Sequence, residues 1–274
     1  WNAHGACSGR PEIPWPVLDD LTDDSLLGGA VRFSQPAHGY RVAIDPILLQ
    51  AAVPAGDGER VLDAGAGTGA ASLCLATRRP SCRIVGLEVQ RSLHRIAVHN
   101  VTQNGLAGRV EMIAGDLERL PPRLSGASFD HVMSNPPHLV EAAATGSPVA
   151  ERARAHHEGS LDLQGWLSAC VRMLRPGGRL TLIHRPDRLG EIVACLAGRL
   201  GDLVVFPLWP AGERRAAKRV LIQGRKGSRG SLRLMRGLIL HDADGRYSPV
   251  AECVLRHGKA LDLSEDWTDG AHRD

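Results

Sequence analysis

The sequence of 274 residues contains few aromatic residues and no long apolar run. Aromatic residues make up 4% of the chain, which argues against a broad platform for stacking bases. No apolar stretch approaches the roughly 18–20 residues that a membrane-spanning helix needs, so we expect no membrane segment. The first 20 residues have neither the basic start nor the apolar stretch of a signal peptide. We therefore expect a cytoplasmic protein.

Patterns typical of metal sites and disulfides are also missing. The six cysteines are far apart and form no C-x-x-C pair. His156 and His157 are adjacent, so their side chains point in different directions and make a poor metal site. We predict reduced, mostly buried cysteines and no bound metal.

Positive charge is concentrated in one part of the chain, although the net charge is only +3. Between positions 212 and 236 there are nine lysines and arginines and a single acid, Glu213. Such a cluster suits the phosphates of a nucleic acid, and the alternative is a solvated basic surface. The residues that we expect to contact RNA are Arg214, Arg215, Lys218 and Arg219.

The chain divides into a small N-terminal extension and one main domain. Alternation predicts strands at 31–35 and 39–44, which would form a hairpin. Asp45 and Pro46 then open a buried helix, with Asp45 as the N-cap. The expected division is a tail at 1–21, a hairpin and helix at 22–58, the main domain at 59–263 and a second tail at 264–274.

Strand-like and helical segments alternate through the main domain. The predicted strands are 61–63, 83–88, 110–114, 131–134, 179–184, 203–209 and 219–223, and the predicted helices are about 69–78, 90–104, 160–174 and 187–199. Residues 175–178 read as a helix stop and turn, and 212–236 as the most loop-like part of the second half. This alternation predicts an α/β fold with a parallel sheet, which binds ligands at the carboxyl ends of its strands.

A glycine-rich turn follows the first of these strands. Asp63 is followed by Gly65, Gly67 and Gly69, and glycines let a backbone turn tightly and approach a ligand closely. The segment also satisfies the looser dinucleotide pattern G-x-G-x-x-G/A. Asp63 favours S-adenosylmethionine, because its carboxylate would attract a cationic amino-acid group and repel a pyrophosphate.

Two further carboxylates lie at strand ends. Glu88 ends the second strand, where a carboxylate can bind both ribose hydroxyls, a feature that NAD sites share. Asp116 follows the third strand and suits the exocyclic amine of an adenine. We therefore predict S-adenosylmethionine as the cofactor.

An Asn-Pro-Pro sequence follows the fourth strand and faces the same edge of the sheet. The Asn135 side-chain oxygen and the Pro136 carbonyl can both accept hydrogen bonds from an exocyclic NH2 group, which would aim its lone pair at a methyl donor. Prolines restrict φ and make this arrangement stiff. Alignment of the amine with the methyl donor then accounts for the rate of transfer, because the nitrogen can lose its proton after the attack and needs no strong base. These residues predict methyl transfer to an amine.

These motifs resemble those of the class I S-adenosylmethionine-dependent methyltransferases that modify exocyclic or amide nitrogens through an N-P-P-aromatic motif. The resemblance covers roughly residues 22–263 and is greatest to the bacterial valine-tRNA adenine-N6 methyltransferases, supported by segments 22–29, 39–49 and 238–247. It implies a Rossmann-like, seven-stranded sheet and methyl transfer to adenine N6 in tRNA. The cofactor-binding residues that it implies are Asp45, Asp63, Ala64, Gly65, Gly67, Gly69, Glu88, Asp116, Leu117 and Asn135. The catalytic residues that it implies are Asn135, Pro136, Pro137 and His138.

The motif departs from this group at its fourth position, where His138 replaces the usual aromatic residue. Histidine can stack on a base, but more weakly and with a charge that varies near neutral pH. Three alternatives therefore stay open: a guanine-N2 methyltransferase acting on rRNA, a protein-glutamine N-methyltransferase, and a non-catalytic module that binds the cofactor and RNA. The basic stretch would be unexpected in a protein-glutamine enzyme.

Overall fold

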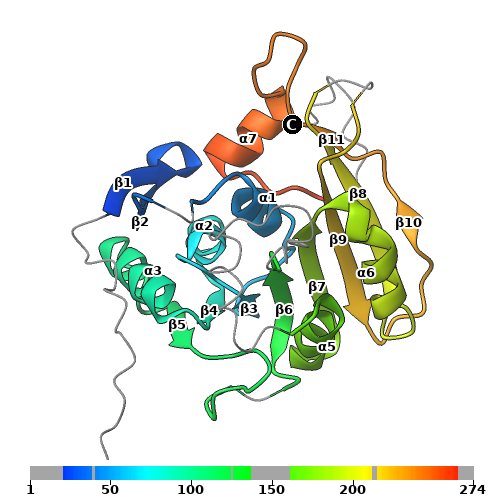
Figure 1. The fold of residues 1–274 in the computed structure, drawn as a ribbon, viewed down its shortest axis with the longest axis horizontal. Helices are drawn as coiled ribbons and strands as arrows, with labels where there is room; N and C mark the ends of the chain where they lie inside the picture. The colour runs from blue at the N-terminus through cyan, green and yellow to red at the C-terminus, as the bar shows by residue number, and fades with distance from the viewer. Residues whose placement is uncertain (1–20, 39–40, 125, 137–160, 212–214, 265–274) are drawn as a thin grey trace, which may run out of the picture.

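The computed structural model describes residues 21–38, 41–124, 126–136, 161–211 and 215–264. Within these ranges the centre is a nine-stranded sheet with helices on both faces (Figure 1). Its strands are β3 (Arg60–Ala64), β4 (Arg83–Glu88), β5 (Val110–Ala114), β6 (Phe129–Ser134), β7 (Leu174–His184), β8 (Leu200–Trp209), β9 (Arg219–Lys226), β10 (Arg233–Leu234) and β11 (Leu238–Ile239). The seven longer strands lie in the order β5-β4-β3-β6-β7-β9-β8, and both β10 and β11 pair with β8.

Strand direction gives this sheet one edge where several strands end together. Strands β3 to β7 pair in parallel, whereas β9 runs antiparallel to both β7 and β8. The expected Rossmann-like arrangement of seven strands is thus confirmed, with two short strands added at one side. The carboxyl ends of β3, β4 and β6 meet at the same edge, where such sheets bind ligands.

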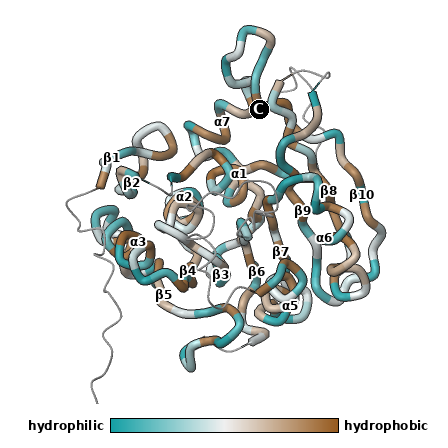
Figure 2. Tube along the Cα trace, viewed as in Figure 1, coloured by the Kyte–Doolittle hydropathy of each residue, from teal (hydrophilic) through white to brown (hydrophobic). Residues whose placement is uncertain are grey.

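Two hydrophobic cores cover the two faces of the sheet. The helices are α1 (Asp45–Ala51), α2 (Ala70–Arg78), α3 (Arg91–Gln103), α5 (Leu163–Met173), α6 (Leu189–Leu196) and α7 (Pro249–His257), with 3-10 turns η2 (Leu27–Gly29) and η3 (Pro186–Arg188). Helices α1, α2, α3 and α7 contribute to one core, and α5 and α6 to the other. Hydrophobic residues lie along the central strands β6 and β7, as buried parallel strands require (Figure 2). No helix in the described part of the chain has the length and apolar character that a membrane crossing requires.

The N-terminal hairpin exists, but its strands are not those predicted. Strand β2 (Val31–Pro36) pairs antiparallel with β1 (Leu21–Leu26), not with residues 39–44. Of the predicted second strand, 39–40 lie outside the described residues and 41–43 form no strand. Side chains hold β1 in place: Gln35 Nε2 donates to Asp24 at 2.6 Å and Ser34 Oγ to Asp23 at 3.1 Å. Since β1 lacks apolar alternation, its sequence gave no strand signal.

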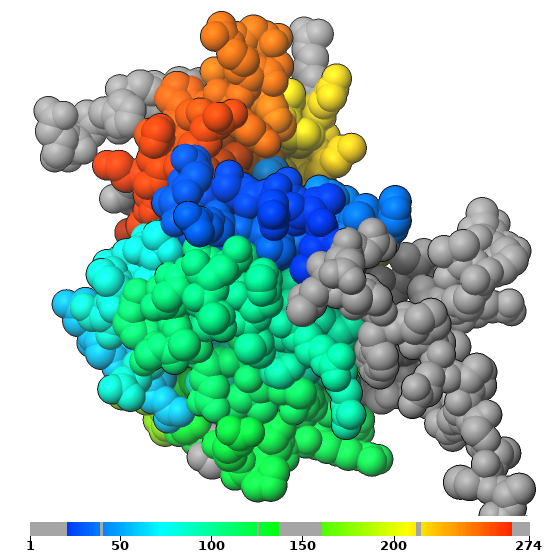
Figure 3. Space-filling model, turned by 90° about the vertical axis from the view of Figure 1, so that its left-hand side faces the viewer, coloured from blue at the N-terminus to red at the C-terminus, as the bar shows by residue number. Residues whose placement is uncertain are grey.

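Two asparagines, Asn100 in α3 and Asn104 directly after its last residue, attach this hairpin to the main domain. Asn100 and Asn104 each accept from the N–H and donate to the C=O of one β2 residue, Ser34 and Arg32 respectively, at 2.7–2.9 Å. Four residues advance a helix by about 6 Å and two residues advance a strand by about 6.8 Å, so the spacings match. Asn100 is fully buried and also donates to the Thr68 carbonyl at 3.0 Å. Figure 3 shows the hairpin (blue) between the C-terminal segment that carries α7 (orange-red) and α3 (green).

The predicted turn at 175–178 is also different in the structure. Helix α5 ends at Met173, as expected, but β7 starts at once with Leu174 and runs through this segment. The pairing of β7 with β6 shifts between Phe129 and His131, so the extra residues form a bulge. Gly177, with φ of 78°, supplies the left-handed conformation that the bulge needs.

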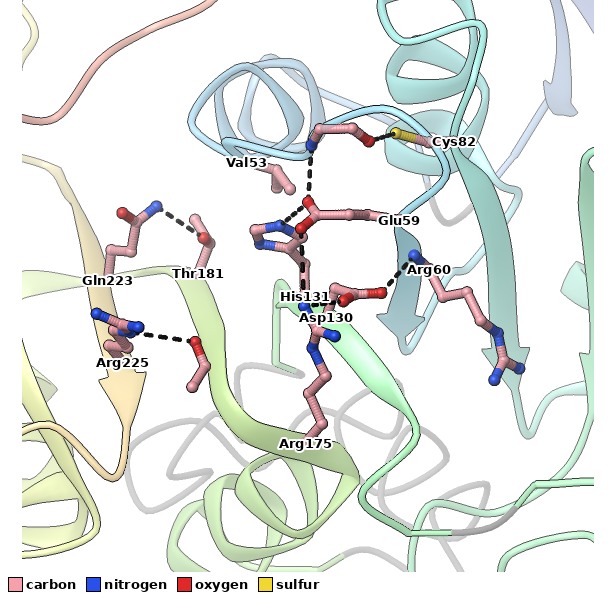
Figure 4. A network of polar contacts seen from close by, with 12 residues as sticks. Val53, Glu59, Arg60, Cys82, Asp130, His131, Arg175, Thr181, Gln223 and Arg225 are labelled. Atoms are coloured by element: carbon pink, nitrogen blue, oxygen red, sulfur yellow. Dashed lines mark hydrogen bonds and ion pairs between the residues drawn. The ribbon is translucent and has the colours of Figure 1, made fainter.

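A polar network ties the strands together at the opposite, amino edge of the sheet (Figure 4). His131 Nε2 lies 2.8 Å from Glu59 Oε2, and Arg175 forms an ion pair with Asp130. Asp130 also accepts from the Arg60 backbone N–H at 2.8 Å. Burial lowers the pKa of His131 despite the neighbouring Glu59 carboxylate. This network is structural, because it lies at the far end of the strands from the ligand-binding edge.

We predict that Asn100→Ala lowers the free energy of unfolding by about 3 kcal/mol or more. The substitution leaves the backbone groups of Ser34 and Thr68 buried without partners, each at a cost of roughly 1–3 kcal/mol. Asn104→Ala is the matched control: it removes an equivalent pair of bonds that water can replace, so we expect a loss below about 1 kcal/mol. Urea denaturation of both variants measures the difference, and equal losses would contradict this account.

Candidate functional site

The loop after β3 is held flat against the end of β4. The Gly65 and Ala66 N–H groups both donate to the Leu87 carbonyl, at 2.9 and 3.0 Å. Gly67 N–H donates to Glu88 Oε2 at 2.8 Å. Gly65, Gly67 and Gly69 have φ of 81°, 56° and 89°, a region that side-chain-bearing residues avoid. The predicted glycine loop is therefore present, with α2 starting directly after Gly69.

Asp63 lies at the end of β3 and faces α2. It is 2% exposed, and its Oδ2 accepts from Ser72 Oγ at 2.7 Å. Burial raises the pKa of Asp63 to about 7, with a further contribution from the negative charge of Glu88. A cation bound beside this carboxylate would oppose both effects and stabilise the charged form.

The other two predicted carboxylates lie at the ends of neighbouring parallel strands, β4 and β5, at the same edge. Glu88 is buried, and its two oxygens accept from the N–H groups of Gly67 and Gln90 at 2.8 Å. Gly115 N–H donates to the Glu88 carbonyl at 3.0 Å, so the half-buried Asp116 follows a residue that is bound to the end of β4. Leu117, the next residue, is buried. Each Glu88 oxygen keeps a second lone pair, so the carboxylate could still bind a ribose hydroxyl.

Asn135 and Pro136 follow β6 at this edge, whereas Pro137 and His138 lie outside the described residues. Asn135 Oδ1 is buried and has no hydrogen-bond partner in the described ranges. A buried acceptor without a partner is rare in proteins and calls for an explanation. The preceding residue, Ser134, donates its hydroxyl to the Ala64 carbonyl at 2.7 Å and so joins the end of β6 to the start of the glycine loop.

These residues fit the S-adenosylmethionine that the sequence predicts. The loop presents backbone rather than side chains at its glycines, and Thr68 Oγ1 is a second buried polar atom without a partner among the described residues. Asp63, Glu88 and Asp116 could hold the ammonium, ribose and adenine of the cofactor, respectively. Within the same ranges no group of His, Cys, Asp and Glu side chains could hold a metal ion.

Asp45 does not have the predicted capping role. The N-cap of α1 is Ile44, and Asp45 is the first helical residue. Its Oδ2 forms an ion pair with Arg219 Nε at 2.6 Å, which joins α1 to the start of β9. Sequence reasoning missed this pair because the two residues are 174 positions apart.

The described residues of the basic segment form no single cluster. Strand β9 crosses the sheet over about 24 Å, so Arg215 and Lys218 lie at the ligand-binding edge and Arg229 at the opposite one. Arg215 and Lys218 are exposed, Arg219 is bound to Asp45, and Arg214 lies outside the described residues. The strand predicted at 219–223 is present in this segment as β9 and extends to Lys226, and the short strand β10 follows it, so this part of the chain is less loop-like than expected.

We predict that the affinity for S-adenosylhomocysteine, which carries the same ammonium group as the cofactor, rises close to tenfold between pH 6 and pH 7.5. The free protein holds Asp63 largely protonated at pH 6, because its pKa is about 7, and the bound cation favours the ionised form. Below pH 7.5 the ligand's own amine stays mostly charged.

Calorimetry on three proteins measures this dependence. Asp63→Asn should bind more weakly and lose the pH dependence. Asp57→Asn, a change in the exposed turn before β3, should behave as wild type. A wild-type affinity that stays constant or falls with rising pH would contradict the assignment of Asp63.

Comparisons with known proteins agree with this geometry. Residues 55–194 match a family described as a methyltransferase domain. The tRNA1(Val) (adenine(37)-N6)-methyltransferase of Aeromonas hydrophila is 33% identical over 217 residues, which cover 76% of this chain and 85% of that protein. The enzyme of the same name from Porphyromonas gingivalis is 30% identical over 229 residues, covering 78% and 87%.

A solved structure of another protein has a similar fold. The crystal structure of an Agrobacterium tumefaciens protein, described as a predicted O-methyltransferase, matches with a TM-score of 0.65 at 25% identity. The match covers 79% of this chain and 97% of that one. The chain therefore belongs to the class I S-adenosylmethionine-dependent methyltransferases, in the family that contains these tRNA-modifying relatives.

Proposed function

We propose that this enzyme methylates the exocyclic N6 amine of an adenine in tRNA. The observation that supports this most directly is the buried Oδ1 of Asn135 beside the glycine loop, which has no hydrogen-bond partner in the part of the chain that the structure describes. An acceptor that the described residues leave without a donor suits an NH2 group brought by the substrate. The names of the relatives, tRNA1(Val) (adenine(37)-N6)-methyltransferase, favour adenine in tRNA over other amines. A tRNA substrate would place the enzyme in the cytoplasm.

The chain's own residues would act by orienting the acceptor amine. S-Adenosylmethionine supplies an electrophilic methyl group when bound. Asn135 Oδ1 and the Pro136 carbonyl would each accept one N6 hydrogen, which turns the nitrogen lone pair toward the cofactor loop. Pro136 is buried and its φ is restricted, so the two acceptors are fixed before the substrate arrives. The proton can leave to water after the attack, so no strong base is required.

Asp45, which was expected to bind the cofactor, and Arg219, which was expected to contact RNA, would instead support this arrangement through their ion pair. Their ion pair neutralises Arg219 and fixes the start of β9 next to α1. The exposed Arg215 and Lys218 just before it are then the described cations best placed for phosphates near the acceptor. Bases in a tRNA loop are suitable acceptors because little energy is needed to turn them out of the stack.

We predict that Asn135→Ala lowers methyl transfer to tRNA at least about 100-fold, the scale of losing one oriented polar group at a reacting centre. S-Adenosylhomocysteine should still bind within about twofold of wild type. The assay is transfer of labelled methyl from S-adenosylmethionine to separate tRNA, rRNA and protein fractions, with Asn104→Ala as the control. Label that accumulates in rRNA or protein would overturn the tRNA assignment, and an active Asn135→Ala would overturn the role of Asn135.

We predict that Arg215→Ala combined with Lys218→Ala weakens tRNA binding about tenfold at physiological salt. The slope of log affinity against log salt should fall in magnitude by about 1.5, as expected for two lost phosphate contacts. Arg229→Ala with Arg233→Ala is the matched control, because it removes two exposed charges away from this edge. Equal losses in the two double variants would show that net charge alone controls binding.

A further inference from the structure

A tryptophan outside every predicted motif touches both halves of the site. Trp166 is the fourth residue of α5, and the start of this helix is fixed by Asp162, whose Oδ1 accepts from Gly165 N–H at 2.7 Å. The indole Nε1 of Trp166 donates to Ser134 Oγ at 3.0 Å. The Ser134 hydroxyl in turn donates to the Ala64 carbonyl at 2.7 Å. One chain of hydrogen bonds therefore runs from α5 through the end of β6 to the end of β3.

The indole ring also lies directly against the glycine loop. A Cβ added to Gly65 would come within 3.0 Å of Trp166 Cζ2 and 3.2 Å of Cη2, which is tighter than ordinary van der Waals contact. Any side chain at position 65 would have to displace this ring. The absence of a side chain at Gly65 thus serves two purposes, the left-handed backbone and the contact with Trp166.

Ser134 is the residue that makes the two contacts dependent on each other. It is fully buried and immediately precedes Asn135. Its hydroxyl donates its one hydrogen to the Ala64 carbonyl and accepts the indole hydrogen of Trp166. The Ala64 carbonyl and the Trp166 indole N–H then each have a hydrogen-bond partner. The hydroxyl is left with one orientation, which fixes the end of β6 relative to the loop.

We propose that Trp166 is a positioning residue that sets the distance between the cofactor loop and Asn135. Methyl transfer needs the donor and the acceptor nitrogen about 3–3.5 Å apart, and misplacement by 1 Å can lower the rate about 100-fold. The Trp166–Ser134–Ala64 chain joins the strand that carries the acceptor residue to the strand that carries the donor loop. This inference rests on the proposed role of Asn135 for its rate effect, but not for its effect on the cofactor loop.

The kinetic test compares two tryptophans. Trp166→Phe keeps a ring against Gly65 and removes the N–H donor. Trp209→Phe is the matched control, because Trp209 Nε1 also donates one bond of similar length, to the Arg236 carbonyl at 2.9 Å. We expect Trp166→Phe to lower the single-turnover transfer rate about tenfold while the dissociation constants for S-adenosylhomocysteine and tRNA stay within twofold. Trp209→Phe should stay within twofold in every measurement.

A double-mutant cycle shows whether Trp166 acts through Ser134. Ser134→Ala should slow transfer by at least as much as Trp166→Phe, and the double variant should be no slower than the slower single variant. Three results would each overturn the proposal. They are an unchanged transfer rate in Trp166→Phe, a transfer rate that falls only because cofactor affinity falls, and fully additive effects of the two substitutions.

A fluorescence measurement makes the test independent of the acceptor. Binding of S-adenosylhomocysteine should change the tryptophan emission of wild type and Trp209→Phe, but not that of Trp166→Phe. If wild type methylates no RNA, the proposed function fails while this measurement still decides whether Trp166 contacts the cofactor loop. An emission change that persists in Trp166→Phe would overturn the inference.

Discussion

The arrangement of the site depends on the close contact between the loop after β3 and the end of β4. Two backbone N–H groups of the loop share the Leu87 carbonyl, and a third binds the Glu88 carboxylate. These contacts require the left-handed conformations of Gly65, Gly67 and Gly69. They bring the loop beside Glu88 and, through the pairing of β3 with β6, beside Asn135. The glycine loop and Asn135, which are seventy positions apart in the chain, therefore meet at one edge.

Segments distant in the chain stabilise this edge from both sides. On one side Asn100 joins β2 of the N-terminal hairpin to the Thr68 carbonyl in the glycine loop. On the other side the ion pair of Asp45 with Arg219 joins α1 to β9. Because these groups are buried or half-buried, breaking either link leaves polar atoms without partners. The hairpin and β9 are thus parts of the site's framework, although neither carries an Asn-Pro-Pro or glycine motif.

The sequence predicted the central sheet well, because buried parallel strands are short apolar runs and the glycine loop has a distinctive spacing. It failed where side chains from distant segments decide the structure. The strand 21–26 has the sequence LTDDSL, with no apolar alternation, and is held by bonds from Ser34 and Gln35. Asp45 precedes a proline at a helix start, the usual pattern of an N-cap, but its partner is Arg219. Trp166 has no local signature at all, since its role depends on the packing of α5 against β6.

The most direct test of the account is nucleoside analysis of tRNA that the wild-type enzyme has methylated in vitro with labelled S-adenosylmethionine. The proposed orientation of an exocyclic amine by Asn135 and Pro136, together with the names of the relatives, predicts that the label appears as N6-methyladenosine. Label recovered as N2-methylguanosine would contradict the choice of adenine while leaving the fold and cofactor intact. Label on a ring nitrogen or a ribose oxygen would contradict the central claim, because Asn135 would then not align an exocyclic amine.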